Sequence, residues 1–294
     1  MIYDLTLAIR YRYESRATAA RTLLRMVPMD NARQQVLTAQ VSCVPEPAMR
    51  SEEVDFFGNA MVAVTFAEPL SEVTFRLKAR VRRHEGEESM DLSPSLSLLA
   101  NDVAAETSLG PESPHHFTAA SERVSLGGEI GVFASRTTQS APTALQAVRA
   151  LSTALHDWFE FDATATEVTT DPAEAFARRR GVCQDISHVM IAGLRSVGVP
   201  AGYVSGFLRT EPPEGRPRLE GADAMHAWVR AWCGREMGWI EIDPTNDMAV
   251  GEDHVAVAIG RDYADVAPVK GSLRSAGPHT TRHAVDMVPE VEGR

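Results

Sequence analysis

One stretch, residues 178–207, constrains the fold of this chain more than any other. It reads RRRGVCQDISHVMIAGLRSVGVPAGYVSGF. After Gly181, apolar residues recur at three- and four-residue steps, which predicts a helix with one buried face. Gly198 and Pro200 are typical of a helix end, and the apolar run at 201–208 predicts a buried strand. Cys183 is therefore expected in the first turn of a buried helix.

That position has chemical consequences for the thiol of Cys183. The first N–H groups of a helix have no partner within the helix, and the helix dipole places partial positive charge there. Both effects favour the nucleophilic thiolate, and the same N–H groups can donate to an oxyanion. A cysteine at a helix start can equally be a small apolar side chain in the core. Cys183 therefore needs suitable partners before it becomes a candidate nucleophile.

Two strands downstream supply such partners. MHAWVRAW (residues 225–232) alternates strictly and predicts a strand with His226 near its start. WIEID (residues 239–243) continues the pattern and ends where Asp243 meets Pro244. If the two strands are antiparallel neighbours, His226 and Asp243 lie close together, with the imidazole directed at the helix of Cys183. A nucleophilic thiol needs a base, and the base needs a group that fixes its tautomer.

The segments GVCQDISHVM, MHAWVRAW and GWIEIDPTND together resemble the transglutaminase-like superfamily, whose members are papain-like thiol enzymes. GRDYADVAPVKG (residues 260–271) is similar to the segment after the core in bacterial members, and DFFGNAMVAVTF to their N-terminal β-rich domain. The resemblance covers nearly the whole chain. It implies a catalytic triad of Cys183, His226 and Asp243 that transfers acyl groups from peptide or glutamine-type amides through a thioester.

The second oxyanion donor stays open. The backbone N–H of Cys183 is the first candidate, and the side chains of Trp158, Gln184 and Tyr263 are candidates for the second. Asp185 is expected in the first helical turn, where the dipole stabilises an acid. The family pattern also has an acidic residue there, so Asp185 is a candidate to line the site.

Other histidines and carboxylates are weaker candidates for the base and for the carboxylate that orients it. His188 lies five positions after Cys183, off the same helical face, and is expected to be a structural or surface group. His254 follows the second strand and has no carboxylate partner at strand spacing. Asp247 is the rival to Asp243 for the third position of the triad.

No metal or other cofactor is expected. Cys183, His188, His226 and Cys233 are zinc-ligand types, but no C-x-x-C or H-x-x-x-H pair is present. Cys233 also lies an odd number of positions from His226, on the opposite strand face. His115 and His116 are adjacent without a carboxylate at helical spacing, and no calcium loop can be recognised.

The predicted fold class is α+β. Short alternating segments at 2–13, 22–28, 35–44, 61–66 and 73–82 predict an N-terminal β-sandwich or barrel-like domain. Start signals at 140–142 and 170–172 predict helices before the one that carries Cys183. The expected domains are 1–135, β-rich, and 136–270, a catalytic core of helices on an antiparallel sheet, with a linker inside 127–140. Residues 271–294 form a tail that could add a final strand.

Composition limits the partners. The formal net charge of −11 argues against nucleic acid or an anionic membrane surface as the main partner. The sequence has no run of eighteen apolar residues, its N-terminus alternates unlike a signal peptide, and its three cysteines are scattered. A cytoplasmic protein that acts on a peptide or protein substrate is expected. The oligomeric state stays open.

Hydrolysis is favoured over transamidation because water is the default acceptor and a transferase must exclude it. The segment 210–222, rich in Pro, Gly and Glu, resembles a solvated loop rather than a lid. Its glutamates could still attract a lysine acceptor; they are Glu211, Glu214 and Glu220. Protein-glutamine transamidation, or a non-catalytic binding module on the same core, are the alternatives.

Overall fold

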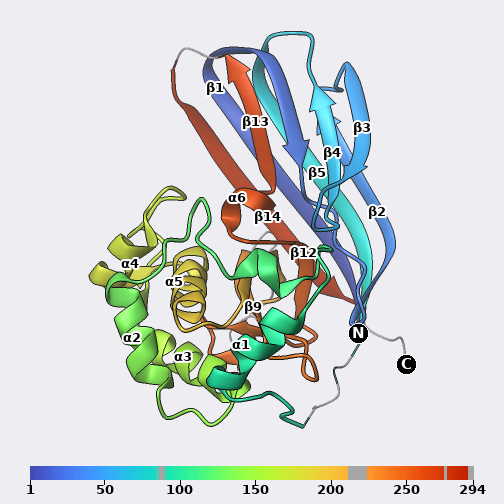
Figure 1. The fold of residues 1–294 in the computed structure, drawn as a ribbon. Helices are drawn as coiled ribbons and strands as arrows, with labels where there is room; N and C mark the ends of the chain where they lie inside the picture. The colour runs from blue at the N-terminus through green and yellow to red at the C-terminus, as the bar shows by residue number, and fades with distance from the viewer. Residues whose placement is uncertain (85, 87–89, 211–223, 275–276, 291–294) are drawn as a thin grey trace, which may run out of the picture.

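The computed structural model describes residues 1–84, 86, 90–210, 224–274 and 277–290. Two antiparallel sheets organise the chain (Figure 1). A curled sheet of seven strands, mostly from the N-terminal part, lies beside a core in which helices pack on a five-stranded sheet. The predicted α+β class with an N-terminal β domain is confirmed.

The seven-stranded sheet is built around its first strand. Its strand order is β2-β5-β1-β4-β3, and β13 and β14 also pair with β1. The strands are β1 (Ile2–Leu24), β2 (Gln34–Val44), β3 (Met49–Val54), β4 (Ala60–Thr65), β5 (Leu70–Arg83), β13 (Val269–Arg274) and β14 (His279–Pro289). Tyr3, Leu5, Leu7 and Ile9 alternate along β1 and are fully or almost fully buried, so one face of the sheet forms the core of this half.

One prediction in this half is wrong, and one strand is not predicted. The run at 22–28 is no separate strand, because β1 continues to Leu24. The pairing register of β1 shifts between Arg12 and Ala17. Before the shift, β1 pairs with β5 and β14. After Ala17, it pairs with β13 and β4. The strand β3 is unpredicted because all six of its residues are exposed, so its sequence lacks the alternation of a half-buried strand.

The core surrounds the helix α5 (Cys183–Ser196), which is buried along most of its length. It contacts α2, α3, α4 and the strands β8 and β9. The helices are α1 (Leu96–Ala105), the short 3₁₀ helix η1 (Pro114–Phe117), α2 (Gly128–Thr138), α3 (Ala144–Trp158), α4 (Pro172–Arg178) and α6 (Tyr263–Val266). The strands, in sheet order β11-β10-β9-β8-β12, are β11 (Met248–Ala249), β10 (Trp239–Asp243), β9 (Ala224–Trp232), β8 (Ala201–Leu208) and β12 (His254–Gly260).

The predicted linker at 127–140 is wrong, because this segment forms α2. The helix buries Ile130, Ala134 and Thr138 and packs against α3 and α5. Gly127 and Gly128 both adopt positive φ angles at its start, which is a turn that glycine allows. The same two glycines give the segment the composition of a linker, although its apolar residues have helical spacing.

The two sheets meet at the free edge of β12. The buried side chains of Gln34 and Asn59, from the N-terminal half, hydrogen-bond the backbone of Ala256 and Ile259 in β12. The chain then returns to the first sheet through β13 and β14 (Figure 1). The expected tail therefore contains the strand β14, while the boundaries at 135 and 270 stay predictions.

Among the described residues, no helix is both long and apolar enough to cross a membrane. Residues 211–223, which include the glutamates of the predicted solvated loop, lie outside the described part of the chain.

Candidate active site

Cys183 is the first residue of α5, as the sequence predicts, and its side chain is partly buried. The first turn is capped by Asp185, whose Oδ2 accepts hydrogen bonds from the backbone N–H of Val182 at 2.8 Å and from Thr166 Oγ1 at 2.6 Å. The carboxylate thus supplies an acceptor for one backbone N–H that has no partner within the helix. The N–H of Cys183 itself has no acceptor within the helix and stays a candidate oxyanion donor.

Gly181 is required for this cap. A Cβ atom on Gly181 would lie 2.6 Å from Oδ2 and 2.9 Å from Cβ of Asp185. The backbone before the helix therefore approaches Asp185 more closely than any larger residue permits. Burial raises the pKa of Asp185, while its hydrogen bonds with Thr166 and Val182 oppose the shift. Asp185 lies two residues after Cys183 in the chain and supports the turn that carries it.

His226 and Asp243 are brought together by adjacent strands. β9 and β10 are antiparallel, with Val229 opposite Ile242, and His226 Nε2 lies 2.7 Å from Asp243 Oδ2. Both side chains are buried, His226 to 8% and Asp243 to 0% exposure. The alternation along β9 also separates two clusters. Ala227, Val229 and Ala231 share the main core with α5, whereas Trp228 belongs to a smaller cluster.

The charges of this pair are fixed by their surroundings. Burial alone would lower the pKa of His226, but hydrogen bonding to Asp243 and Cys183 and their charges raise it to about 10. Burial would raise the pKa of Asp243, but hydrogen bonds, chiefly from His226 and His254, hold it far below its usual value. At neutral pH the arrangement favours an imidazolium beside a carboxylate. Since Nε2 of His226 faces Asp243, Nδ1 is the nitrogen left for Cys183.

Asp243 receives more donors than a triad requires. Its Oδ1 accepts from the backbone N–H groups of Thr245 at 2.9 Å and Asn246 at 3.3 Å. Its Oδ2 accepts from Asn246 Nδ2 at 2.7 Å and also lies 3.2 Å from His254 Nε2. The turn that follows β10 therefore wraps around the carboxylate.

His254 is the residue that the sequence prediction misplaced. The sequence predicts no carboxylate partner for it at strand spacing, but it is fully buried at the start of β12 and contacts Asp243. Asn246 was likewise not singled out. In the case of Asn246 the nearby DPTN turn is a usable signal, because Asn side chains commonly hydrogen-bond backbone and neighbouring groups in turns.

The candidates for the second oxyanion donor differ in their surroundings. The indole N–H of Trp158 donates to the carbonyl of Phe176 at 3.2 Å, and Gln184 Nε2 donates to the carbonyl of Val168 at 3.0 Å. The single indole N–H of Trp158 is therefore used within the protein, whereas the amide of Gln184 keeps a second N–H. The ring of Tyr263 lies 6.2 Å from that of Tyr203, a buried tyrosine whose pKa is raised by burial and then by the charge of Cys183. The second donor stays open.

His188 is buried, and its Nε2 accepts from the backbone N–H of Tyr263 at 3.1 Å. Its ring packs 5.0 Å from that of Tyr203. Burial lowers its pKa to about 4, despite the opposing charge of Asp262. His188 therefore supports α6 as a neutral group, which agrees with the structural part of its prediction and rules out the surface position. Asp247, the rival carboxylate, binds the hydroxyls of Ser152 and Thr153 instead.

One group of metal-ligand types occurs among the described residues. The donor atoms of His226, Asp243 and His254 lie within 4.8 Å of one another. Nε2 of His226 and Nε2 of His254 each contact Oδ2 of Asp243. An ion bound by these three side chains would have to replace both contacts. The expectation of a metal-free site stays a prediction.

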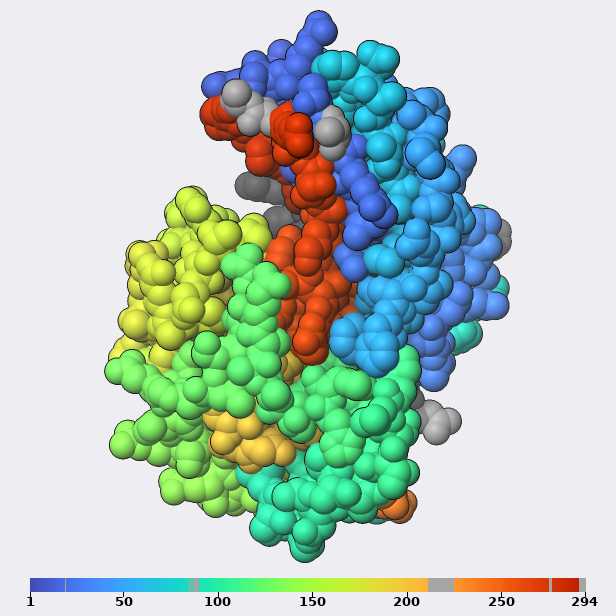
Figure 2. All heavy atoms as spheres, turned by 45° about the horizontal axis from the view of Figure 1, so that its top comes forward, coloured from blue at the N-terminus to red at the C-terminus, as the bar shows by residue number. Residues whose placement is uncertain are grey.

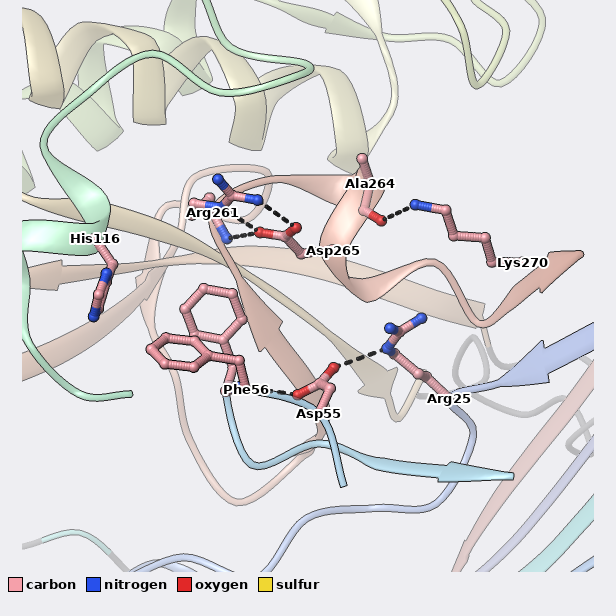
Figure 3. Close-up of a pocket in the computed structure, with 9 residues that line it drawn as sticks. Arg25, Asp55, Phe56, His116, Arg261, Ala264, Asp265 and Lys270 are labelled. Carbon is pink, nitrogen blue, oxygen red and sulfur yellow. Dashed lines mark hydrogen bonds and ion pairs between the residues drawn. The ribbon is translucent and has the colours of Figure 1, made fainter. Parts of the chain in front are cut away.

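A separate cavity of about 420 Å³ lies between the two halves (Figure 3). Its charged groups already have partners: Arg25 pairs with Asp55, Arg261 with Asp265, and Lys270 Nζ donates to the carbonyl of Ala264. Cys183, His226 and Asp243 do not line this cavity. On the outer surface, Figure 2 shows a recess between the region of α4, in yellow, and the strands β13 and β14, in red.

Two family models match parts of the chain. Residues 132–244 match the family model of the transglutaminase-like superfamily, and residues 3–82 match the bacterial transglutaminase-like N-terminal region. The first range contains Cys183, His226 and Asp243. It excludes His254.

Relatives match over nearly their whole length. An uncharacterised protein of Mycobacterium leprae (strain TN) is 32% identical over 289 residues, which cover 96% of this chain and 95% of that protein. An uncharacterised protein of Mycobacterium tuberculosis (strain ATCC 25618 / H37Rv) is 29% identical over 299 residues, with 98% and 92% covered. The crystal structure of a "putative cysteine protease" from Cytophaga hutchinsonii shares the fold with a TM-score of 0.75 at 19% identity, covering 100% of this chain and 92% of that chain.

Proposed function

The chain belongs to the transglutaminase-like superfamily, a family of thiol-dependent acyl-transfer enzymes, and we propose that it hydrolyses peptide or glutamine-type amide bonds. The observation that carries the proposal is the contact of His226 Nε2 with Asp243 at 2.7 Å, together with the hydrogen bonding to Cys183 that helps to raise the pKa of His226. Nucleophile, base and orienting carboxylate then stand in the order that this chemistry needs.

In the proposed reaction the thiolate of Cys183 attacks the amide carbonyl carbon, and the carbonyl oxygen becomes an oxyanion. His226, protonated at Nδ1, gives that proton to the leaving amine as the C–N bond breaks. A thioester remains. A water molecule then attacks the thioester, His226 takes its proton, and the carboxylic acid leaves as Cys183 returns to the thiolate. Asp243 accepts from Nε2–H throughout and stabilises the imidazolium.

Support for the nucleophile comes from the contrast among the three cysteines. Cys43 and Cys233 are buried, which raises the pKa of Cys43 and raises the pKa of Cys233 to about 12. Cys183 is the more accessible thiol, and it lies beside an imidazolium at a helix start. These surroundings favour attack by Cys183 over the other two.

The first experiment is labelling with iodoacetamide followed by peptide mass spectrometry. We expect modification of Cys183 well before Cys43 or Cys233, and loss of turnover in parallel with it. Cys183→Ala should stay folded and lose turnover, with Cys43→Ala as the matched control that keeps turnover. Wild-type turnover in Cys183→Ala would refute the proposal.

A second experiment separates hydrolysis from transamidation. A glutamine-containing peptide is incubated with the protein and an excess of a primary amine, and the products are identified by mass spectrometry. Water needs no dedicated channel to reach the thioester, so cleaved or deamidated peptide should dominate. A predominantly amine-coupled product would identify a protein-glutamine transamidase. Absence of any product, together with an unreactive Cys183, would favour a binding module.

A further inference from the structure

A second histidine, His254, contacts the carboxylate of Asp243 that His226 also contacts. His254 is completely buried, and its Nε2 lies 3.2 Å from Oδ2 of Asp243, the same oxygen that contacts His226. The rings of His226 and His254 lie 6.1 Å apart, and Trp228 packs edge-on against His254 at 5.3 Å. The two histidines therefore reach one carboxylate from different strands, β9 and β12.

The other nitrogen of His254 reveals its tautomer. The backbone N–H of Gly251 donates to Nδ1 at 3.3 Å, so Nδ1 carries a lone pair and no proton. The ring proton must then be on Nε2, which directs an N–H at Asp243. A ring protonated on both nitrogens would face the Gly251 N–H with another N–H. The geometry requires a neutral imidazole that acts as a donor to the carboxylate.

We propose that His254 is a positioning residue of this site: its Nε2–H holds the carboxylate of Asp243 ionised and oriented toward His226. The proposal rests on the function proposed above. Without this donor, Oδ2 would keep His226 and Asn246, while the turn N–H groups of Thr245 and Asn246 still bind Oδ1 and would draw the carboxylate toward the turn. A misplaced carboxylate would misplace the imidazole, and errors of about 1 Å in such groups can cost about 100-fold in rate.

The N-terminal half fixes the turn that sets this tautomer. Arg83 Nη2 donates to the carbonyl of Gly251 at 2.9 Å, and the hydroxyl of Tyr3 donates to Asp253 at 2.7 Å. The amino group of Met1 pairs with Glu252 at 3.1 Å. Strands β1 and β5 therefore hold both ends of the turn 251–254. This gives the N-terminal sheet a part in ordering the site, transmitted through His254 and Asp243.

The variants His254→Phe and His254→Gln separate positioning from packing. Phe keeps a ring but removes the donor, whereas the amide N–H of Gln can replace Nε2–H. We expect kcat to fall about 10- to 100-fold in His254→Phe with little change in KM, and to recover to within a few-fold of wild type in His254→Gln. The rate of Cys183 alkylation by iodoacetamide, followed from pH 5 to 10, should show the same order without any substrate. Equal values for wild type and both variants would overturn the proposal.

Nitrogen NMR of the uniformly labelled wild-type protein tests the tautomer directly. Long-range proton–nitrogen spectra should show His254 as the neutral Nε2–H form at neutral pH, and a Nδ1–H form or an imidazolium would overturn the proposal. This reading does not depend on turnover or on the folding of His254→Phe. If Cys183 proves unreactive in the wild type, the proposed function fails, while the nitrogen spectra still decide the state of His254.

Discussion

The side-chain amide of Gln34 hydrogen-bonds both backbone groups of Ala256 in the other half of the protein. Gln34 Nε2 donates to the carbonyl at 2.8 Å, and the Ala256 N–H donates to Gln34 Oε1 at 2.9 Å. An amide side chain thus takes the place of a neighbouring strand at the edge of β12, whose one strand partner among the described residues is β8.

We expect Gln34→Ala to destabilise the protein, because the buried N–H of Ala256 would lose its acceptor. An unpaired buried group of this kind costs about 1–3 kcal/mol, so the free energy of unfolding should fall by about 2 kcal/mol. Gln40→Ala, on the exposed part of the same strand β2, is the matched control. Thermal and urea unfolding of the three proteins gives the comparison, and equal stability of the two variants would contradict the role of this contact.

Gly181→Ala should impair both stability and the reactivity of Cys183. The added Cβ would lie 2.6 Å from Oδ2 and 2.9 Å from Cβ of Asp185, so the cap of α5 must move. Such overpacking costs about 1–3 kcal/mol. In Gly110→Ala the added Cβ meets only the hydroxyl of Ser108 at 3.3 Å, so this variant should behave as wild type. Tm and the alkylation rate of Cys183 are the measurements, and an unchanged alkylation rate in Gly181→Ala would show that the cap is dispensable.

Asp243→Asn should leave the protein folded but lower kcat by about 10³- to 10⁴-fold, because an amide cannot hold the imidazole in the required tautomer. Asp247→Asn is the control. Asp247 has a φ of 47°, which Asn tolerates, and it contacts two hydroxyls outside the site. Steady-state kinetics on one peptide substrate compares the two. A large loss of kcat in Asp247→Asn with none in Asp243→Asn would show that Asp247 is the carboxylate that orients the imidazole.

His188 should make stability depend on pH between about 4 and 6.5. Its folded-state pKa is lowered by burial to about 4, below the unfolded value near 6.5. The unfolded chain therefore binds the proton first as pH falls, and stability present above pH 6.5 is lost toward pH 4, by up to about 3 kcal/mol. His226 has its pKa raised to about 10, so its stabilising contribution is complete below pH 6.5 and is lost only as pH rises toward 10.

Urea unfolding at several pH values from 4 to 7.5 measures this effect. His188→Gln should flatten the dependence, whereas the exposed His84→Gln should preserve it. The same slope in wild type and His188→Gln would assign the acid sensitivity to other groups.

Turnover should be insensitive to chelators. Thiolate, imidazole and amide donors suffice for acyl transfer, and both Nε2 atoms of the His226, Asp243 and His254 group already contact the carboxylate. Preincubation with EDTA or 1,10-phenanthroline should leave kcat unchanged. A loss that zinc or calcium restores would mean that this group binds an ion.

Local patterns predicted α5, β9 and β10, because each is a continuous amphipathic or alternating segment. Their sequence order alone suggested that His226 and Asp243 meet. His254 could not be placed in the same way. It starts β12, which β8 and β9 separate from β10 in the sheet order, and yet its Nε2 lies 3.2 Å from Asp243 Oδ2. Contacts of this kind depend on tertiary geometry, which strand spacing does not encode.

Two further features show the same limit. The strand β3 has six exposed residues and is formed by pairing with β4, not by burial of its own side chains. Gln34 and Asn59 look like ordinary turn or surface residues in the sequence, yet they are buried at 1% and 0% exposure against the edge of β12. Buried amides are recognisable only when the backbone groups they satisfy are known.

The pairing of β1 with β14 places Tyr3 opposite Pro289, so one edge of β1 is covered by a strand that comes much later in the sequence. Until β14 is synthesised, β1 exposes a row of unpaired backbone groups along residues 3–13. A nascent chain in that state is open to pairing with strands of other chains. Translation speed and chaperone capture while the residues between β1 and β14 are synthesised should therefore influence the yield of folded protein.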